Sequence, residues 1–247
     1  MRHPYARVLA VPAITGLLAS SAVTPLVAAD QHDSSARERG SIDSSGPRPP
    51  GKYRGLNSGE WLAVWWQENL AAAVEGGHHP LIDAGAVGDN NRTVFLVGPV
   101  LPADSARVTT RVTIPSGTHL VVPIITVECS EAEEPPFHGD DEAQLRACAN
   151  DLLDQASEPS MRIDGRLVKD PHTYRVETPL FRYGPLTANN YLGLPAGTQS
   201  DAVGAGYVLV LQPLSVGVHR IRVAANVFAF GLAADTEFII TVEPQRR

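Results

Sequence analysis

The sequence predicts a mainly β fold, an antiparallel β-sandwich or jelly roll with two peripheral helices. Three observations support this fold class. Short β-rich runs broken by Gly and Pro fill most of the chain after residue 93. Only two segments have clear helical spacing, and the elements lack the regular strand–helix alternation of a parallel sheet. With 247 residues, 43% of them hydrophobic, the chain is long enough for one well-buried core.

Residues 1–29 have the three parts of a secretory signal peptide. Arg2 and Arg7 precede an apolar stretch, and small residues before Asp30 offer a cleavage site. An uncleaved anchor is the alternative, but the apolar stretch is shorter than the roughly 20 residues of a comfortable membrane span. We therefore expect a secreted or periplasmic protein with no membrane attachment after cleavage.

Residues 30–57 are polar and rich in Ser, Arg, Gly and Pro, which predicts a flexible leader before a single β-sandwich domain at 58–247. The whole chain has a net charge of −7, and the part after residue 29 carries −9, because the signal holds two arginines and no acid. An acidic surface repels phosphate backbones and anionic lipids. Nucleic acid is therefore not an expected partner.

The first predicted helix covers residues 58–75. Its Leu and Trp residues follow helical spacing, Asn57 and Glu60 fit a capping box, and Gly76-Gly77 is a good stop signal. The three tryptophans of this segment could stack on sugars. The favoured interpretation is that they form a wide aromatic face that docks the helix onto a sheet.

A nearly continuous apolar run at 118–128 predicts a strand buried on both faces, although Pro123 is unexpected in a central strand. The second predicted helix follows at about 140–152, where Asp140 or Asp141 can cap its first turn. The other strands predicted before this helix are residues 93–97 and 107–114.

Residues 161–168 predict a tight hairpin in which Asp164-Gly165 forms a type I′ turn. A strand at 174–178 leads into a long connection at 179–197, and connections of this length are often functional. The remaining strands form a predicted meander of residues 206–211, 218–227 and 236–242.

Cys129 and Cys148 are the only cysteines, and an oxidising compartment favours a disulfide between them. Cys129 lies just past the buried strand, and Cys148 is on the inward face of the second predicted helix. The bridge would then pin this helix against the sheet. Two buried free thiols are the alternative, and the spacing fits no zinc pattern.

Five short phrases spread over residues 58–243 carry a resemblance to known proteins. They are Trp65-Trp66-Gln67 and residues 95–98, 123–129, 145–149 and 213–221. In residue composition and in their order along the chain, these phrases resemble a group of uncharacterised secreted bacterial proteins with a signal peptide and one β-rich domain. The resemblance implies export and a single shared domain, and it implies no reaction.

Glu128 is the first candidate catalytic residue. It ends a strongly apolar strand, and a carboxyl group at the rim of a core tends to have the raised pKa that a general acid requires. His219 could share a cleft with it as acid or base. The alternatives are that Glu128 pairs with an arginine or with backbone N–H groups, and that His219 packs half-buried in a sheet.

Other recognised signatures are missing from the sequence. It has no G-x-S-x-G elbow, H-E-x-x-H motif, P-loop or Rossmann glycine pattern, so we expect no cofactor. His78-His79 with Asp83 could bind a metal, but solvated loop side chains are the better interpretation. The acidic segment 131–142 could bind calcium, although its spacing fits no EF-hand and its last acids suit a helix N-terminus. We expect no metal site.

Three functions remain open. The favoured one is a glycan-binding, small-ligand-binding or envelope-associated module, with Tyr183 and Tyr191 of the long connection as ligand-stacking residues. The second is a secreted hydrolase or lyase that acts on a polysaccharide or a small polar substrate through Glu128 and His219. The third is a purely structural protein of the cell envelope.

Overall fold

The computed structural model describes residues 52–88 and 92–244. The predicted signal peptide and most of the predicted leader lie outside this part. The helical elements are α1 (Ser58–Ala71), α2 (Pro80–Asp83), α3 (Glu142–Leu153) and the 3-10 turns η2 (Pro171–Tyr174) and η3 (Phe228–Phe230). The strands are β1 (Gly85–Gly88), β2 (Thr93–Val97), β3 (Leu101–Pro102), β4 (Val108–Pro115), β5 (His119–Ser130), β6 (Ser157–Ile163), β7 (Arg166–Leu167), β8 (Arg175–Glu177), β9 (Phe181–Tyr183), β10 (Ser200–Leu211), β11 (Gly217–Val227) and β12 (Leu232–Glu243).

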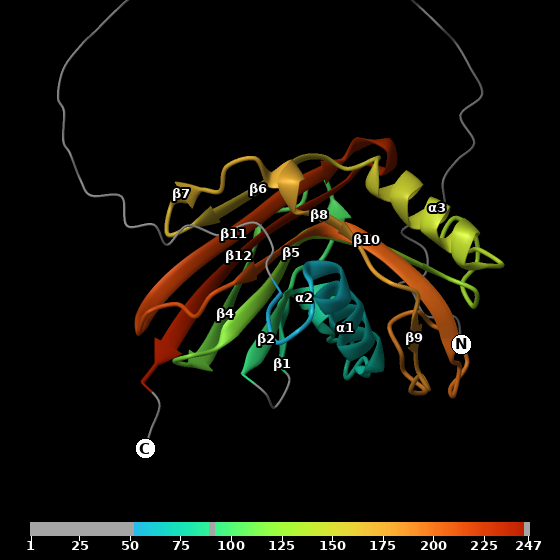
Figure 1. Ribbon diagram of the computed structural model, residues 1–247, viewed down its shortest axis with the longest axis horizontal. Helices are drawn as coiled ribbons and strands as arrows, with labels where there is room; N and C mark the ends of the chain where they lie inside the picture. The colour runs from blue at the N-terminus through green and yellow to red at the C-terminus, as the bar shows by residue number, and fades with distance from the viewer. Residues whose placement is uncertain (1–51, 89–91, 245–247) are drawn as a thin grey trace, which may run out of the picture.

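The strands form two six-stranded sheets, which confirms the predicted mainly β fold (Figure 1). The first sheet has the order β1-β2-β5-β10-β8, with β9 also paired to β10. The second has the order β3-β12-β11-β6-β7, with β4 also paired to β12. Most neighbours are antiparallel as predicted, but β2–β5 and β4–β12 run parallel. Between β2 and β5 the chain crosses to the second sheet through β3 and β4, and such a long crossover permits parallel pairing.

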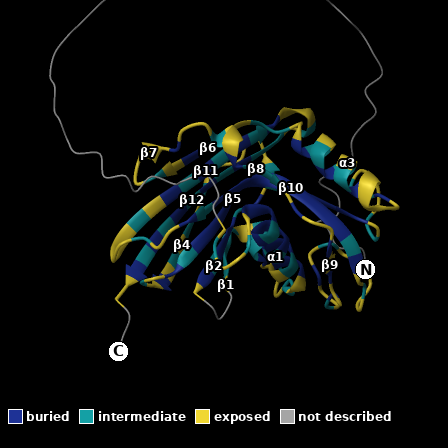
Figure 2. Cartoon of the chain, viewed as in Figure 1, coloured by how far each residue is buried: buried dark blue, intermediate teal, exposed yellow. Residues whose placement is uncertain are grey.

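The main hydrophobic core lies between the two sheets. β5 and β10 contribute Leu120 and Val203 from one side, and β11 and β12 contribute Ile221 and Phe238 from the other, all of them buried. The opposite face of the first sheet is covered by α1, whose three tryptophans are buried in a second cluster. Figure 2 shows the buried residues running along β5, β10 and α1. The predicted docking of the aromatic helix face on a sheet is confirmed.

The predicted capping box opens α1. Glu60 N–H donates to Asn57 Oδ1 at 3.0 Å, and Asn57 N–H donates to the Glu60 carboxylate at 2.7 Å. The helix ends at Ala71, four residues earlier than predicted. Val74 N–H donates instead to Asn189 O at 2.6 Å, so the loop before β10 takes over backbone groups that a longer helix would have used.

A change of register in β5 decides which of its side chains face α1. The pairing with β10 shifts opposite Tyr207 and Val208, where β5 has one extra residue. Beyond this shift, Glu128 and Ser130 lie on the α1 side, whereas Cys129 lies in the core between the sheets. Pro123 is tolerated because β2 pairs only with the first three residues of β5.

Three local predictions are confirmed. Asp164 and Gly165 have φ angles of 49° and 79° in the β6–β7 turn. Asp141 caps α3 by accepting a hydrogen bond from Gln144 N at 2.9 Å. Cys129 and Cys148 form the disulfide that joins α3 to β5. Within the described residues, no helix combines the length and the hydrophobicity needed to cross a membrane.

The last residues of the predicted leader pack against the domain. Tyr53 stacks on His119 at a ring distance of 3.7 Å and on Trp61 at 5.5 Å. Trp61 Nε1 also donates to the Tyr53 carbonyl at 3.1 Å. The folded part therefore begins a few residues before the predicted boundary at 58.

Candidate functional site

Two carboxyl groups, from Glu128 and Glu133, meet on the α1 side of the first sheet. Glu128 is only 4% exposed at the end of β5, and its Oε1 atom has no hydrogen-bond partner among the described residues. Glu133 is half-buried in the loop after β5, and its carboxyl group is within hydrogen-bonding reach of that of Glu128. We call these two residues the carboxyl pair.

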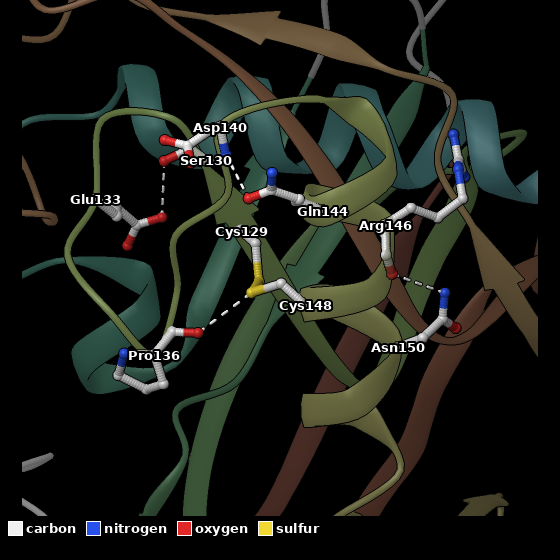
Figure 3. Close-up of a disulfide and its surroundings, with 9 residues drawn as sticks. All are labelled: Cys129, Ser130, Glu133, Pro136, Asp140, Gln144, Arg146, Cys148 and Asn150. Carbon is white, nitrogen blue, oxygen red and sulfur yellow. Dashed lines mark hydrogen bonds between the residues drawn. A yellow bond between two sulfur atoms is a disulfide. The ribbon is translucent and has the colours of Figure 1, made fainter.

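A chain of hydroxyl groups supports the carboxyl pair. Ser130 Oγ donates to Glu133 Oε2 at 2.9 Å (Figure 3). Ser130 Oγ also lies 2.9 Å from the Tyr183 hydroxyl. Because the only hydroxyl hydrogen of Ser130 is directed to Glu133, Tyr183 is the donor to Ser130. Figure 3 also shows Glu133 extending from its loop toward Ser130, next to the Cys129–Cys148 disulfide. The disulfide closes the chain segment that carries Ser130 and Glu133, and so it holds the site together.

Burial shifts the ionisation of both members of the pair. It raises the pKa of Glu128 well above its ordinary value, and the neighbouring charge of Glu133 raises it further. Burial also raises the pKa of Glu133 to about 7, although hydrogen bonds from Glu128 and Ser130 act in the opposite direction. The raised pKa of Glu128 favours its protonated form at neutral pH, and the pKa of Glu133 lies near neutral pH.

Trp66 forms the wall of the site next to Glu128. Its indole Nε1 donates to Thr126 Oγ1 at 3.2 Å, and its ring lies over Gly204, which is the β10 partner of Glu128. A Cβ atom on Gly204 would lie 3.0 Å from the Trp66 ring. Glycine is therefore needed at this point for the indole to pack flat on the sheet beside the carboxyl pair.

Trp66 also lines an aromatic cavity of about 110 Å³, whose lining residues do not include Glu128 or Glu133. It lies where β2 and β5 diverge, and Trp65, Trp66 and Tyr191 line it together with aliphatic residues of both sheets. Tyr191 lines the cavity and also senses the charge of Glu133. The pKa of its phenol is raised mainly by burial, and the charge of Glu133 raises it further. Its ring stacks on His79 at 5.2 Å.

The two predicted ligand-stacking tyrosines lie in different environments. Tyr191 is 41% exposed and lines the aromatic cavity. Tyr183 is only 2% exposed, because it points to the α1 side of β9 and packs in the second hydrophobic cluster. Tyr183 was predicted to stack on a ligand, but its ring is buried, and its hydroxyl group instead contacts Ser130 beside the carboxyl pair.

His219 does not join Glu128. It lies on β11 in the second sheet, where Nδ1 bonds Asp164 Oδ2 at 2.8 Å and Nε2 bonds the Ser215 carbonyl at 2.9 Å. Burial lowers the pKa of His219, but these hydrogen bonds outweigh it and the pKa is raised. Both ring nitrogens face acceptors, so this histidine ties two turns together, and no contact in the described part links it to Glu128.

The histidine pair before α2 has structural contacts. His79 Nδ1 accepts from Leu81 N at 3.1 Å, so its Nε2–H donates to the Asn69 carbonyl at 3.0 Å. Burial lowers the pKa of His79, which favours this neutral form. His78 bonds Asp83 at the surface. Across residues 52–88 and 92–244, no three His, Cys, Asp or Glu side chains are grouped as in a metal site.

The acidic segment 131–142 is divided among several roles. Asp140 pairs with His138, Asp141 caps α3, and Glu142 pairs with Arg146. Glu133 is the acid of this segment that turns inward to meet Glu128. The sequence does not distinguish Glu133 as a site residue, because it is one of several similar acids in a run and only the fold of the loop turns it inward.

A second hollow, of about 400 Å³, lies on the outer face of the second sheet. Its charged residues are already paired with each other or with neighbours. Arg222 forms two hydrogen bonds to Asp235, at 2.8 and 2.9 Å, and Glu158 accepts from Asn226 at 2.8 Å. In contrast to the carboxyl pair, these groups do not need a ligand to satisfy them.

Comparisons with known proteins identify no relative. The sequence matches no protein-family model, and no similar curated protein and no similar solved structure was found.

Proposed function

We propose that this chain is an exported β-sandwich module that binds a small molecule or a glycan unit against the carboxyl pair. The observation that carries the proposal is the Oε1 atom of Glu128, a buried acceptor without a partner among the described residues. Leaving such a group unpaired costs about 1–3 kcal/mol. A ligand that donates a hydrogen bond would recover this cost.

The surroundings of the pair suit a binding site. Ser130 and Tyr183 fix the position of Glu133, so the acceptors are ordered before a ligand arrives. Trp66 and Tyr191 offer aromatic surface on the side of the cavity. A few polar groups among aromatic side chains are the usual composition of a small-molecule site.

Export is part of the proposal. Its support is the signal-peptide pattern at residues 1–29 and the disulfide between Cys129 and Cys148, which persists in oxidising compartments. Such a location brings the site into contact with glycans and small solutes of the cell envelope.

A hydrolase or lyase is the second candidate, because the pKa of about 7 for Glu133 suits a general acid at neutral pH. Two features weigh against it. The two carboxyl groups are within hydrogen-bonding reach of each other, whereas the paired acids of glycosidases stand about 5–9.5 Å apart. His219, the other expected catalytic residue, has its contacts in the second sheet.

A ligand screen tests the proposal. The melting temperature of the mature protein would be measured with a panel of monosaccharides, disaccharides and small polar solutes, in parallel with hydrolysis of chromogenic glycosides. We expect at least one compound to raise the melting temperature of the wild type and not of Glu133→Gln. Glu134→Gln is the matched control, since Glu134 is an exposed acid in the same loop. If a compound raised the melting temperatures of Glu133→Gln and Glu134→Gln equally, the assigned site would be contradicted. Hydrolysis of a glycoside by the wild type that is lost in Glu133→Gln would favour the enzyme.

A further inference from the structure

We infer that the ligand of the carboxyl pair carries a primary ammonium group, as in an amino sugar or a small polyamine. This inference rests on the proposed function and adds the chemical class of the ligand. It follows from the charge of the pair, the hydrogen bonds still open there and the aromatic side chains beside it.

Among residues 52–88 and 92–244, the carboxyl pair has no cationic partner. None of the ion pairs formed by the described residues includes Glu128 or Glu133. The other groups that act on the pair are hydroxyls, from Ser130 and Tyr183. A charge held in a partly buried site without a counter-charge is costly, so a bound cation would be strongly favoured there.

An ammonium group matches the open hydrogen bonds. It has three N–H donors and no acceptor. One donor would satisfy the unpartnered Oε1 of Glu128, and another would bond the carboxylate of Glu133. A neutral hydroxyl group has a single donor, so it could satisfy only one of these acceptors at a time.

The aromatic residues favour an organic cation over a metal ion. The Trp66 ring lies over Gly204, the strand partner of Glu128, and the face of such a ring attracts ammonium groups. The ring also offers contacts to the carbon atoms of a ligand. Calcium takes about six to eight oxygen ligands, and the described site supplies two carboxyl groups and two hydroxyls.

Matched probes test the inference by calorimetry and thermal shift at neutral pH. The pairs are n-butylamine with 1-butanol and glucosamine with glucose, and the further probes are tetramethylammonium and calcium chloride. We expect each amine to bind about tenfold or more tightly than its alcohol or sugar partner, because hydrogen bonds to charged groups are the stronger ones. Tetramethylammonium, which has no N–H donor, should bind more weakly than n-butylamine.

Two variants and one control locate the binding. Glu133→Gln removes the charge and should weaken amine binding about tenfold or more. Glu128→Leu removes the Oε1 acceptor without adding a charge, and it should also weaken amine binding. Glu134→Gln should bind amines as the wild type does.

Each other outcome overturns the inference. Equal binding of amines and neutral partners that is lost in Glu133→Gln would keep the proposed function and reject the ammonium group. Tetramethylammonium binding as tightly as n-butylamine would show that N–H donors are not needed. Stabilisation by calcium alone would make the pair a metal site. If no probe binds, the inference fails, and the proposed function fails with it only if the wider ligand screen is also silent.

Discussion

Raising the pH from 4.5 to 7 should destabilise the protein, because the folded site retains a proton that the unfolded chain releases. An unfolded glutamate ionises at its ordinary pKa of 4.5, whereas the pKa of Glu133 in the folded protein is about 7. Between these values the folded state binds more protons, so its stability falls by about 1.4 kcal/mol per pH unit. The full window gives about 3 kcal/mol, and water access to half-buried Glu133 reduces this to roughly 2 kcal/mol.

Other groups titrate in the same window, so the comparison must be between variants. The raised pKa of His219 also removes stability as the pH rises, whereas the lowered pKa of His79 adds stability. Both contributions are the same in the wild type and in Glu133→Gln, and they cancel in the difference. Glu128 remains protonated in both, because its own burial is the main cause of its raised pKa.

Urea unfolding at several pH values between 5 and 7 measures the effect. The free energy of unfolding of the wild type should fall by roughly 2 kcal/mol more than that of Glu133→Gln over this range. Glu134→Gln should follow the wild type. Parallel curves for the wild type and Glu133→Gln would refute the raised pKa of Glu133.

Three further perturbations have defined outcomes. Replacing Cys129 and Cys148 by serine should lower the free energy of unfolding by about 3 kcal/mol, measured with urea, because the bridge spans 19 residues; an unchanged value would show that the disulfide does not constrain the site. Gly204→Val should lower the melting temperature and change the tryptophan fluorescence spectrum more than Ala205→Val, the packing control, because a Cβ atom at residue 204 would lie 3.0 Å from the Trp66 ring. An unaltered spectrum would contradict this packing. His219→Ala should cost about 1–2 kcal/mol at pH 6 and less at pH 8, because the stabilising charge is lost above its raised pKa, while amine binding stays unchanged; a loss of binding would return His219 to the site.

Local features of the fold could be predicted because they depend on residues near one another in the sequence. The Asn57–Glu60 capping box and the Asp164-Gly165 turn follow from side-chain chemistry at fixed spacing. The disulfide followed from the number of cysteines and the inward face of the second helix. The end of α1 was wrong because the backbone of Val74 pairs with a loop more than a hundred residues away.

Only half of the candidate site could be predicted. Glu128 was singled out because it ends an apolar strand, and burial does raise its pKa. Its partner Glu133 is one of several loop acids, and only the folding of that loop over β5 brings it inward. Tyr183 was predicted as a ligand-stacking residue of the long connection at 179–197, whereas it lies buried on the three-residue strand β9. Contacts between distant segments decide these positions, and spacing along the chain does not reveal them.

The ionisation of the carboxyl pair can be observed directly by carbon NMR of the protein with ¹³C-labelled glutamate side chains, with Glu128→Gln and Glu133→Gln providing the assignments. We expect the Glu133 carboxyl resonance to titrate near pH 7 and the Glu128 resonance to remain that of a protonated acid through this range. If both carboxyl groups titrated near the ordinary pKa of 4.5, burial would not raise their pKa values, and the candidate site would lose its physical basis.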